Sequence, residues 1–419
     1  MNEVKISVAL FNRATFSRVK ALLDLIHIDK DIKLNLILGS ALLDKEYGEA
    51  ADYIKRDYSK FDITSLSYNS YKGNPNRICL VSADILKGMS EHLLKNKPDC
   101  LIVVADRFET LPAAIASSYL NIPTLQIQAG EVTGNLDEKI RHSVTKLSDY
   151  QICNTTLSKQ YVVAMGEEFK RVFTAGCTSI DFVKRRRLHR WTPKERYMIS
   201  IFHPDTNNLE NNAAETEVLL NAVVDFCYKK NQKCYWYWPN PDPGREDLIS
   251  LLTRYHEKYP KLLVKAINKE PFDFINQAAG ATIAIRNSSC LIREFSSIGI
   301  PCVNIGDRQS VRERSWNIKD CEPVYEELMK TFEEQYSVKR YKSSNLYGYG
   351  KASEKIVNIL KRIEFTLKGH LTYPLNFQYR EDHLGEQRFI KHKLDGKKSK
   401  QLVDSVTERK SLSGKSFGP

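Results

Sequence analysis

The chain has 419 residues, of which 42% are hydrophobic and 27% are charged, and its formal net charge is +12. This length and composition are typical of a globular protein with two domains, each large enough to bury its own core. No uninterrupted apolar run reaches the roughly 18 residues of a membrane-spanning helix, and the N-terminus leads into a strand-like run instead of a signal peptide, so we expect a cytoplasmic protein.

The positive charge is concentrated in two segments. Residues 184–197 carry a net charge of +6 and residues 391–419 carry +5, so the rest of the chain is nearly neutral. Basic linkers and tails are usually solvated, and we therefore do not expect contact with nucleic acid or membranes. The nine cysteines show no C-x-x-C spacing and mostly lie in apolar runs, which predicts reduced core thiols instead of disulfides or a zinc site.

The first half of the chain alternates strand-like runs with helix-like stretches. Strands are expected at 5–11, 34–40, 123–131 and 150–155, helices at 12–26 and 83–95, a strand, turn and helix over 99–122, and a loop and helix over 132–148. This alternation predicts a parallel sheet covered on both faces. It also places Arg13, Ser17 and Asp106 near the carboxyl ends of strands, where open α/β sheets bind ligands.

The second half repeats the pattern after the basic segment. A strand is expected over 196–206, followed by a helix over 213–230, a strand, turn and helix over 233–255, and a final helix over 353–365. We therefore predict two doubly wound α/β domains with a cleft between them. The expected boundaries are 1–183 for the first domain, 184–197 for a basic linker, 198–366 for the second domain and 367–419 for a basic, mobile tail.

Two short strands of the second half end in polar turns. The strand expected at 281–285 leads to Ser288 and Ser289 at the start of a helix, and the strand expected at 301–305 leads to Arg308. A helix start with free N–H groups, beside a guanidinium, favours an anion such as the phosphates of a nucleotide. An ordinary helix cap and a solvated arginine would give the same pattern, so both interpretations stay open.

Three further features are ambiguous in the same way. Asp106 could belong to a site or cap a helix, and His203, fixed by the following Pro204, could be functional or structural. Glu138 with Arg141 or His142 has the spacing of a surface ion pair. No nucleophile elbow, phosphate-binding Walker sequence, metal-ligand spacing or dinucleotide fingerprint is present. The residues alone predict a two-domain α/β protein that binds a phosphorylated or nucleotide ligand.

Six segments add a family resemblance. They are DRFETLPAAIASSYLNIPTLQIQAGEVTGNLDEKIRHSVTKLS (106–148), TAGCTSID (174–181), FHPDT (202–206), WPNPDPG (238–244), IRNSSCLIRE (285–294) and NIGDRQSVRERSWN (304–317). Their content and order resemble the UDP-N-acetylglucosamine 2-epimerases, in particular the hydrolysing branch of the sialic-acid type. The resemblance implies a glycosyltransferase-B fold, a homodimer or homotetramer, and conversion of UDP-N-acetylglucosamine to N-acetylmannosamine and UDP by elimination and hydration. It implies no metal or redox cofactor.

The resemblance also implies roles for individual residues. Asp106, Asp137 and His203 match acid/base or sugar-positioning residues, and Glu294 matches the carboxylate that holds the uridine ribose. The other residues expected to bind the nucleotide sugar, mainly at its diphosphate, are Arg13, Ser17, Asn240, Ser288, Ser289 and Arg308.

Several positions depart from the family pattern. Gln128 stands where the family has a catalytic-type Glu, and its amide cannot take up a proton; Glu131 could supply the carboxylate instead. Arg286 and Val311 replace glycines, and Tyr349 replaces an Asp. These departures leave three other functions open. They are an epimerase for another nucleotide sugar of the UDP-diacetamido-trideoxyhexose type, a catalytically impaired nucleotide-sugar-binding relative, and a glycosyltransferase.

Overall fold

The computed structural model describes residues 3–369, apart from 45–49, 73, 75, 135, 186–195, 206–208, 240–243, 267–268, 310 and the side chains of Arg185 and Arg286. Most of the expected basic linker, the expected tail from residue 370 onward, and Asn240 therefore lie outside the described residues. Among the described helices, none is both long enough and apolar enough to cross a membrane.

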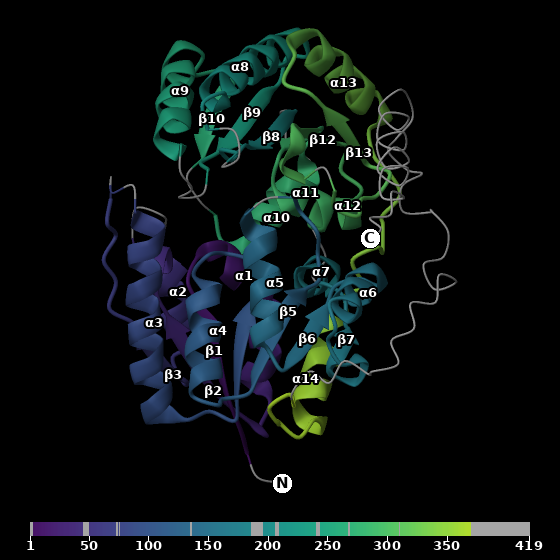
Figure 1. Cartoon of the computed structure of the whole chain (residues 1–419). Helices are drawn as coiled ribbons and strands as arrows, with labels where there is room; N and C mark the ends of the chain where they lie inside the picture. The colour runs from purple at the N-terminus through teal and green to yellow at the C-terminus, as the bar shows by residue number, and fades with distance from the viewer. Residues whose placement is uncertain are drawn as a thin grey trace, which may run out of the picture. The chain divides into compact units, whose positions relative to one another are not determined.

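The first α/β domain is built on a seven-stranded parallel sheet with the order β3-β2-β1-β4-β5-β6-β7 (Figure 1). Its strands are β1 (Val4–Leu10), β2 (Ile32–Leu38), β3 (Asp62–Ser65), β4 (Cys100–Val104), β5 (Thr124–Ala129), β6 (Tyr150–Cys153) and β7 (Val172–Thr174). The connecting helices are α1 (Arg13–Ile28), α2 (Ala50–Asp57), α3 (Arg77–Asn96), α4 (Thr110–Tyr119), α5 (Leu136–Leu147), α6 (Thr156–Ala164) and α7 (Thr178–Arg185). Every residue of β4, β5 and β6 is buried, as expected for strands covered on both faces.

The second α/β domain has a six-stranded parallel sheet with the order β10-β9-β8-β11-β12-β13. Its strands are β8 (Tyr197–Ile201), β9 (Lys233–Tyr237), β10 (Leu263–Ala266), β11 (Ala284–Arg286), β12 (Cys302–Ile305) and β13 (Ile318–Cys321). Its helices are α8 (Asn212–Lys229), α9 (Arg245–Lys258), α10 (Pro271–Gly280), α11 (Ser289–Ile292), α12 (Glu294–Ile298) and α13 (Tyr325–Val338), and α14 (Ala352–Arg362) follows them. Two parallel α/β domains were predicted, and the structure confirms them.

Two helices contact a domain other than the one expected from their place in the sequence, since α7 packs on both domains and α14 packs on the first. Ile180 and Val183 of α7 lie in the core under the second sheet, together with Ile199 of β8. Ile356 and Leu360 of α14 lie in the core under the first sheet. The sequence determines which face of α7 and of α14 is apolar. Which core that face covers depends on where the chain places the helix. The last helix α14 thus returns to the first domain, and α7 lies between the two domains.

Local differences from the expected elements are small. The strand expected at 281–285 begins at Ala284 because Ala281 still caps the preceding helix α10. All nine cysteines are free thiols, and seven of them are buried, whereas Cys290 is partly exposed and Cys79 is exposed. Reduced core thiols were expected from their apolar surroundings, and most of these cysteines follow that expectation.

Candidate active site

One pocket lies between the carboxyl ends of strands from both sheets. It is lined by α1, by the turns after β4, β8, β11 and β12, and by the start of α5. Both sheets are of the open α/β type, which binds ligands at this edge. The polar side chains that line the pocket are Arg13, Ser17, Arg18, Asp106, Arg107, Asp137, His203, Lys269, Ser288, Ser289, Arg293, Glu294, Arg308, Gln309 and Arg312.

The start of α1 brings cations to the first sheet's edge. Asn12 caps the helix, because its Oδ1 accepts a hydrogen bond of 2.9 Å from the backbone N–H of Thr15. Arg13 and Arg18 therefore emerge on the first two turns beside the end of β1. Burial lowers the pKa of the Arg13 guanidinium, so its charge is partly withdrawn from water.

Asp106 is the most heavily paired carboxylate of the pocket. It follows β4 after Ala105, whose φ of +61° turns the chain sharply, and only 3% of its surface is exposed. Arg18 Nη1 donates to Asp106 Oδ1 at 2.9 Å, Arg141 donates to Oδ2, and Arg312 forms an ion pair with Oδ2 at 3.6 Å. Burial alone would raise the pKa of Asp106, but the three guanidiniums hold it well below its usual range. Asp106 is therefore an ionised anchor for arginines.

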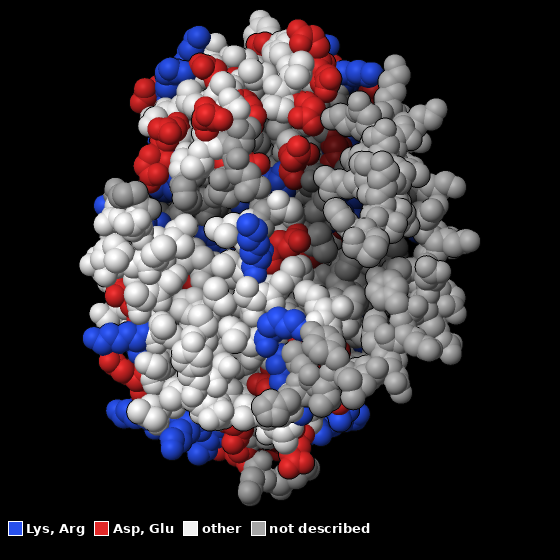
Figure 2. All heavy atoms as spheres, viewed as in Figure 1, with Lys and Arg blue, Asp and Glu red and all other residues white. Residues whose placement is uncertain are grey.

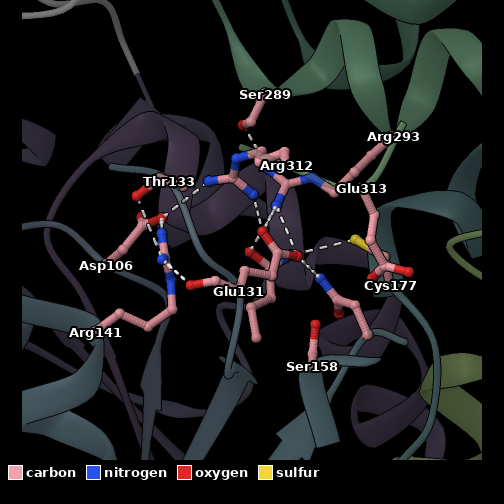
Figure 3. Close-up of polar contacts among 12 residues, drawn as sticks. Asp106, Glu131, Thr133, Arg141, Ser158, Cys177, Ser289, Arg293, Arg312 and Glu313 are labelled. Carbon is pink, nitrogen blue, oxygen red and sulfur yellow. Dashed lines mark hydrogen bonds and ion pairs between the residues drawn. The ribbon is translucent and has the colours of Figure 1, made fainter. Parts of the chain in front are cut away.

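Glu131 joins the two domains at the same place (Figure 3). It follows β5 and forms ion pairs with Arg293 at 3.3 Å and with Arg312, both from the second domain. Asn154 also donates to Glu131, and Arg141 donates to its backbone carbonyl. Glu131 is 5% exposed, so this is a buried network in which each charge depends on its partners.

A bulge in β5 directs Gln128 toward this network. The pairing of β5 with β6 shifts register between Ile127 and Ala129, and Gln128 has a φ of +67°. Such a bulge re-aims a side chain, and a left-handed backbone at a bulky residue is a strain that functional sites often carry. Gln128 Nε2 donates to Cys177 Sγ at 3.2 Å, and its Oε1 accepts from Arg293 Nη1 at 3.3 Å.

Asn287 ties the strand ends of the second sheet together. Its side chain exchanges two hydrogen bonds with the backbone of His203, at 2.8 and 2.7 Å. Its carbonyl accepts from Arg308 Nη1 at 3.1 Å and from Gln309 Nε2 at 3.2 Å. The turns after β8, β11 and β12 are thereby held in register, which fixes His203 and Arg308 on the pocket wall. Beside them, Arg293 Nη2 donates to Ser289 Oγ at 2.6 Å.

Positive charge dominates the pocket. Among the described residues, seven cationic side chains and three carboxylates line it. The cations are Arg13, Arg18, Arg107, Lys269, Arg293, Arg308 and Arg312, and the carboxylates are Asp106, Asp137 and Glu294. An excess of four positive charges in a partly buried site favours a ligand with several negative charges, such as a diphosphate.

Comparison with known proteins identifies the family. Residues 25–361 match the model of the family described as UDP-N-acetylglucosamine 2-epimerase. The chain belongs to this family. The matched part includes every strand of the two sheets except β1, and every pocket residue except the four of α1, so the family match and most of the site lie in one region of the chain.

Two relatives within the 2-epimerases extend over most of the chain. A protein from Legionella pneumophila named UDP-N,N'-diacetylbacillosamine 2-epimerase (hydrolyzing) is 28% identical over 369 residues, which cover 86% of this chain and 96% of the relative. One from Campylobacter jejuni, named GDP/UDP-N,N'-diacetylbacillosamine 2-epimerase (hydrolyzing), is 29% identical over 335 residues, or 77% and 85% of the two chains. The Neisseria meningitidis UDP-GlcNAc 2-epimerase solved with UDP-GlcNAc has a TM-score of 0.69 at 19% identity, covering 86% of this chain and all of that one, which confirms the glycosyltransferase-B fold.

Most residues expected from the epimerase resemblance come together. Nine of them line the pocket: Arg13, Ser17, Asp106, Asp137, His203, Ser288, Ser289, Glu294 and Arg308. Gln128 and Glu131 stand behind the wall and contact it through Arg293. Asn240 lies outside the described residues. Their placement is observed, whereas the roles implied for them remain predictions.

Sequence reasoning missed the arginines that organise the site, namely Arg18, Arg141, Arg293 and Arg312. Of the two surface pairs expected for Glu138, the contact with His142 is present at 3.8 Å, whereas Arg141 is fully buried and contacts Asp106 instead. Glu138 accepts from the backbone N–H groups of Thr133 and Gly134, at 2.5 and 2.6 Å. In the sequence, Arg293 and Arg312 could have been noticed only because they follow the two strands, expected at 281–285 and 301–305, whose ends were predicted to bind an anion.

Proposed function

We propose that this protein is a hydrolysing 2-epimerase of a UDP-linked amino sugar, and that the sugar is of the N,N'-diacetylbacillosamine type. The observation that carries this proposal is the arginine-rich pocket between the carboxyl ends of the two parallel sheets. Sequence alone led us to place UDP-N-acetylglucosamine first. The two relatives named for diacetylbacillosamine favour the alternative sugar instead.

The proposed reaction has two steps. Elimination breaks the bond between the sugar and UDP and removes the proton at the second carbon, and water then adds to the resulting glycal. The departing diphosphate gains negative charge, which Arg293, Arg308 and Arg312 on the pocket wall are placed to stabilise. These cations supply the electrostatic part of catalysis.

Proton transfer needs a titratable group on the pocket wall that is placed to reach the sugar. Asp106 is held ionised by three arginines, and Glu131 is shared between Arg293 and Arg312, so both serve better as positioning residues. Gln128 cannot exchange a proton at neutral pH. Asp137 and His203 line the pocket and are the groups that we propose for proton transfer.

The test is to incubate the purified protein with UDP-N,N'-diacetylbacillosamine or with UDP-N-acetylglucosamine. UDP release and the sugar product are followed by proton NMR. We expect faster release of UDP and of an epimerised free sugar from the first substrate. The Asp106→Asn variant is the control that turnover depends on this pocket. It removes the negative charge that holds Arg18, Arg141 and Arg312 in place, and it changes the side chain by only one atom. Turnover of neither substrate, together with saturable UDP-sugar binding, would instead indicate a catalytically impaired binding protein.

Self-association remains part of the proposal. The face over α4 and the neighbouring part of α3 carries few charged side chains (Figure 2). Leu94 at the end of α3 and Tyr119 at the end of α4 are 61% and 78% exposed. Exposed apolar side chains on these two helices favour a partner, and a homodimer through α3 and α4 is the assembly that we propose. Sedimentation of the wild type and of a Leu94→Lys, Tyr119→Lys variant tests it.

A further inference from the structure

Arg293 is buried, and among the described residues it forms an ion pair with a single carboxylate, that of Glu131. Burial opposes its charge, whereas Cys177, Glu294 and Asp106 nearby raise its pKa.

Arg293 is 2% exposed, and its guanidinium faces the neutral amide oxygen of Gln128, the hydroxyl of Ser289 and the carboxylate of Glu131. Glu131 is also the partner of Arg312. One carboxylate therefore serves two guanidiniums at this point of the domain interface.

The wider cluster repeats this imbalance. The four buried guanidiniums of Arg18, Arg141, Arg293 and Arg312 surround the two carboxylates of Asp106 and Glu131. The Nε donors of Arg293 and Arg312 have no hydrogen-bond partner among the described residues. A buried guanidinium keeps its charge, so the excess of positive charge persists at every physiological pH.

Gln128 affects how far the positive charge of Arg293 is neutralised. Its Oε1 lies 3.3 Å from Arg293 Nη1, where a carboxylate oxygen would neutralise the guanidinium directly. The amide instead offers only a dipole to Arg293, while its Nε2 donates to Cys177 Sγ. A carboxylate could not donate in that way, so the Cys177 contact is suited to an amide.

We propose that Gln128 is a specificity-determining residue. Because its neutral amide leaves the charge of Arg293 incompletely neutralised, Arg293 attracts the diphosphate of a nucleoside-diphosphate ligand to the end of the pocket that holds Arg293 and Ser289. This inference rests on the proposed function, because it takes a nucleoside diphosphate as the ligand. Gln128 acts through Arg293 and is a positioning residue. Ser288, Ser289 and Arg293 line one wall together, so a phosphate there meets hydroxyl and guanidinium donors.

The experiment compares UDP with uridine as ligands of the wild type and of Gln128→Glu, by isothermal titration calorimetry. The added carboxylate should pair with Arg293 and repel the diphosphate, and we expect the affinity for UDP to fall about tenfold, since nearby charges interact strongly in a partly buried site. Uridine carries no phosphate, and its affinity should stay within about twofold. The Gln128→Met variant removes the hydrogen bond without adding charge and should weaken UDP binding less than Gln128→Glu does.

Each other outcome has a distinct meaning. Equal or tighter UDP binding by Gln128→Glu overturns the inference. A parallel loss of UDP and uridine binding also overturns it, since that pattern reports a structural defect. Equal losses in Gln128→Met and Gln128→Glu would assign the effect to the lost hydrogen bond and not to charge. Failure of the wild type to bind UDP contradicts the proposed function itself.

Discussion

Arg312, on the turn after β12, is paired with Glu131, on the turn after β5, and the pair joins the two α/β domains at the floor of the pocket. Thr155, which caps α6 after β6, adds a second contact between the domains, in which its hydroxyl donates to the Glu313 carboxylate. The groups that close the domains are therefore neighbours of those that would bind the ligand.

Glu131→Gln should strongly destabilise the protein. The substitution leaves Arg293 and Arg312 buried without their shared carboxylate, and breaking a buried ion pair from one side costs about 3 kcal/mol or more. Chemical unfolding followed by tryptophan fluorescence measures the change. The matched control is Glu217→Gln, which removes the exposed partner of Arg254 and should cost less than about 1 kcal/mol. A similar effect of both substitutions would contradict the buried network.

Asp106 should make stability depend on acid. Burial opposes ionisation, but Arg18, Arg141 and Arg312 together hold the pKa of the folded carboxyl well below that of the unfolded chain, near 3.9. A lowered folded pKa means that the stabilisation is fully present above about pH 4 and is lost as the pH falls toward the folded value. The free energy of unfolding should thus fall less steeply with acid in Asp106→Asn than in the wild type. Identical acid profiles of the two proteins would argue against this prediction.

Gly130 should tolerate no side chain. Its φ is +77°, and a Cβ built there would lie 2.1 Å from the carbonyl oxygen of Ser158, so both the backbone and the space forbid alanine. We expect Gly130→Ala to cost more than about 3 kcal/mol of unfolding free energy, since the clash adds to the left-handed strain. Gly306 has a φ of +65° but nothing within 4 Å, and Gly306→Ala should cost only about 1 kcal/mol. Thermal unfolding of the two variants separates strain from clash.

Arg308→Ala should weaken UDP binding about tenfold or more, because it removes a cation from the pocket wall where a charge-assisted hydrogen bond to phosphate is expected. The loss should shrink at high salt, which screens the remaining attraction. Calorimetric titration at two salt concentrations provides the measurement. Arg254→Ala, which changes an exposed arginine of α9, is the control and should leave affinity unchanged. An equal effect of the two substitutions would mean that Arg308 acts only through overall charge.

The sequence predicted the location of those site residues that directly follow a strand. Asp106, His203, Ser288 and Arg308 follow apolar runs, and the carboxyl ends of parallel strands meet at one edge, so their convergence could be predicted. The family pattern added Asp137, which lies at the start of a helix.

The arginine cluster could not be predicted in this way. Arg18 and Arg141 lie on helices, where arginine is usually solvated. Only the packing of α1 against β4 and of α5 against β5 turns both side chains toward Asp106. The same limit applies to α7 and α14. Their periodicity predicts an apolar face, but a periodic pattern does not say which of two similar cores that face will cover.

The position of α14 on the first core has a consequence for synthesis of the protein. All strands of the first sheet have been synthesised once β7 emerges from the ribosome. Ile356 and Leu360 cover part of its core but are translated about 180 residues later. At a typical elongation rate of 5–20 residues per second, that surface stays uncovered for roughly 10 s or longer. The nascent first domain should therefore depend on a chaperone, or on the ribosome surface, until the last helix arrives.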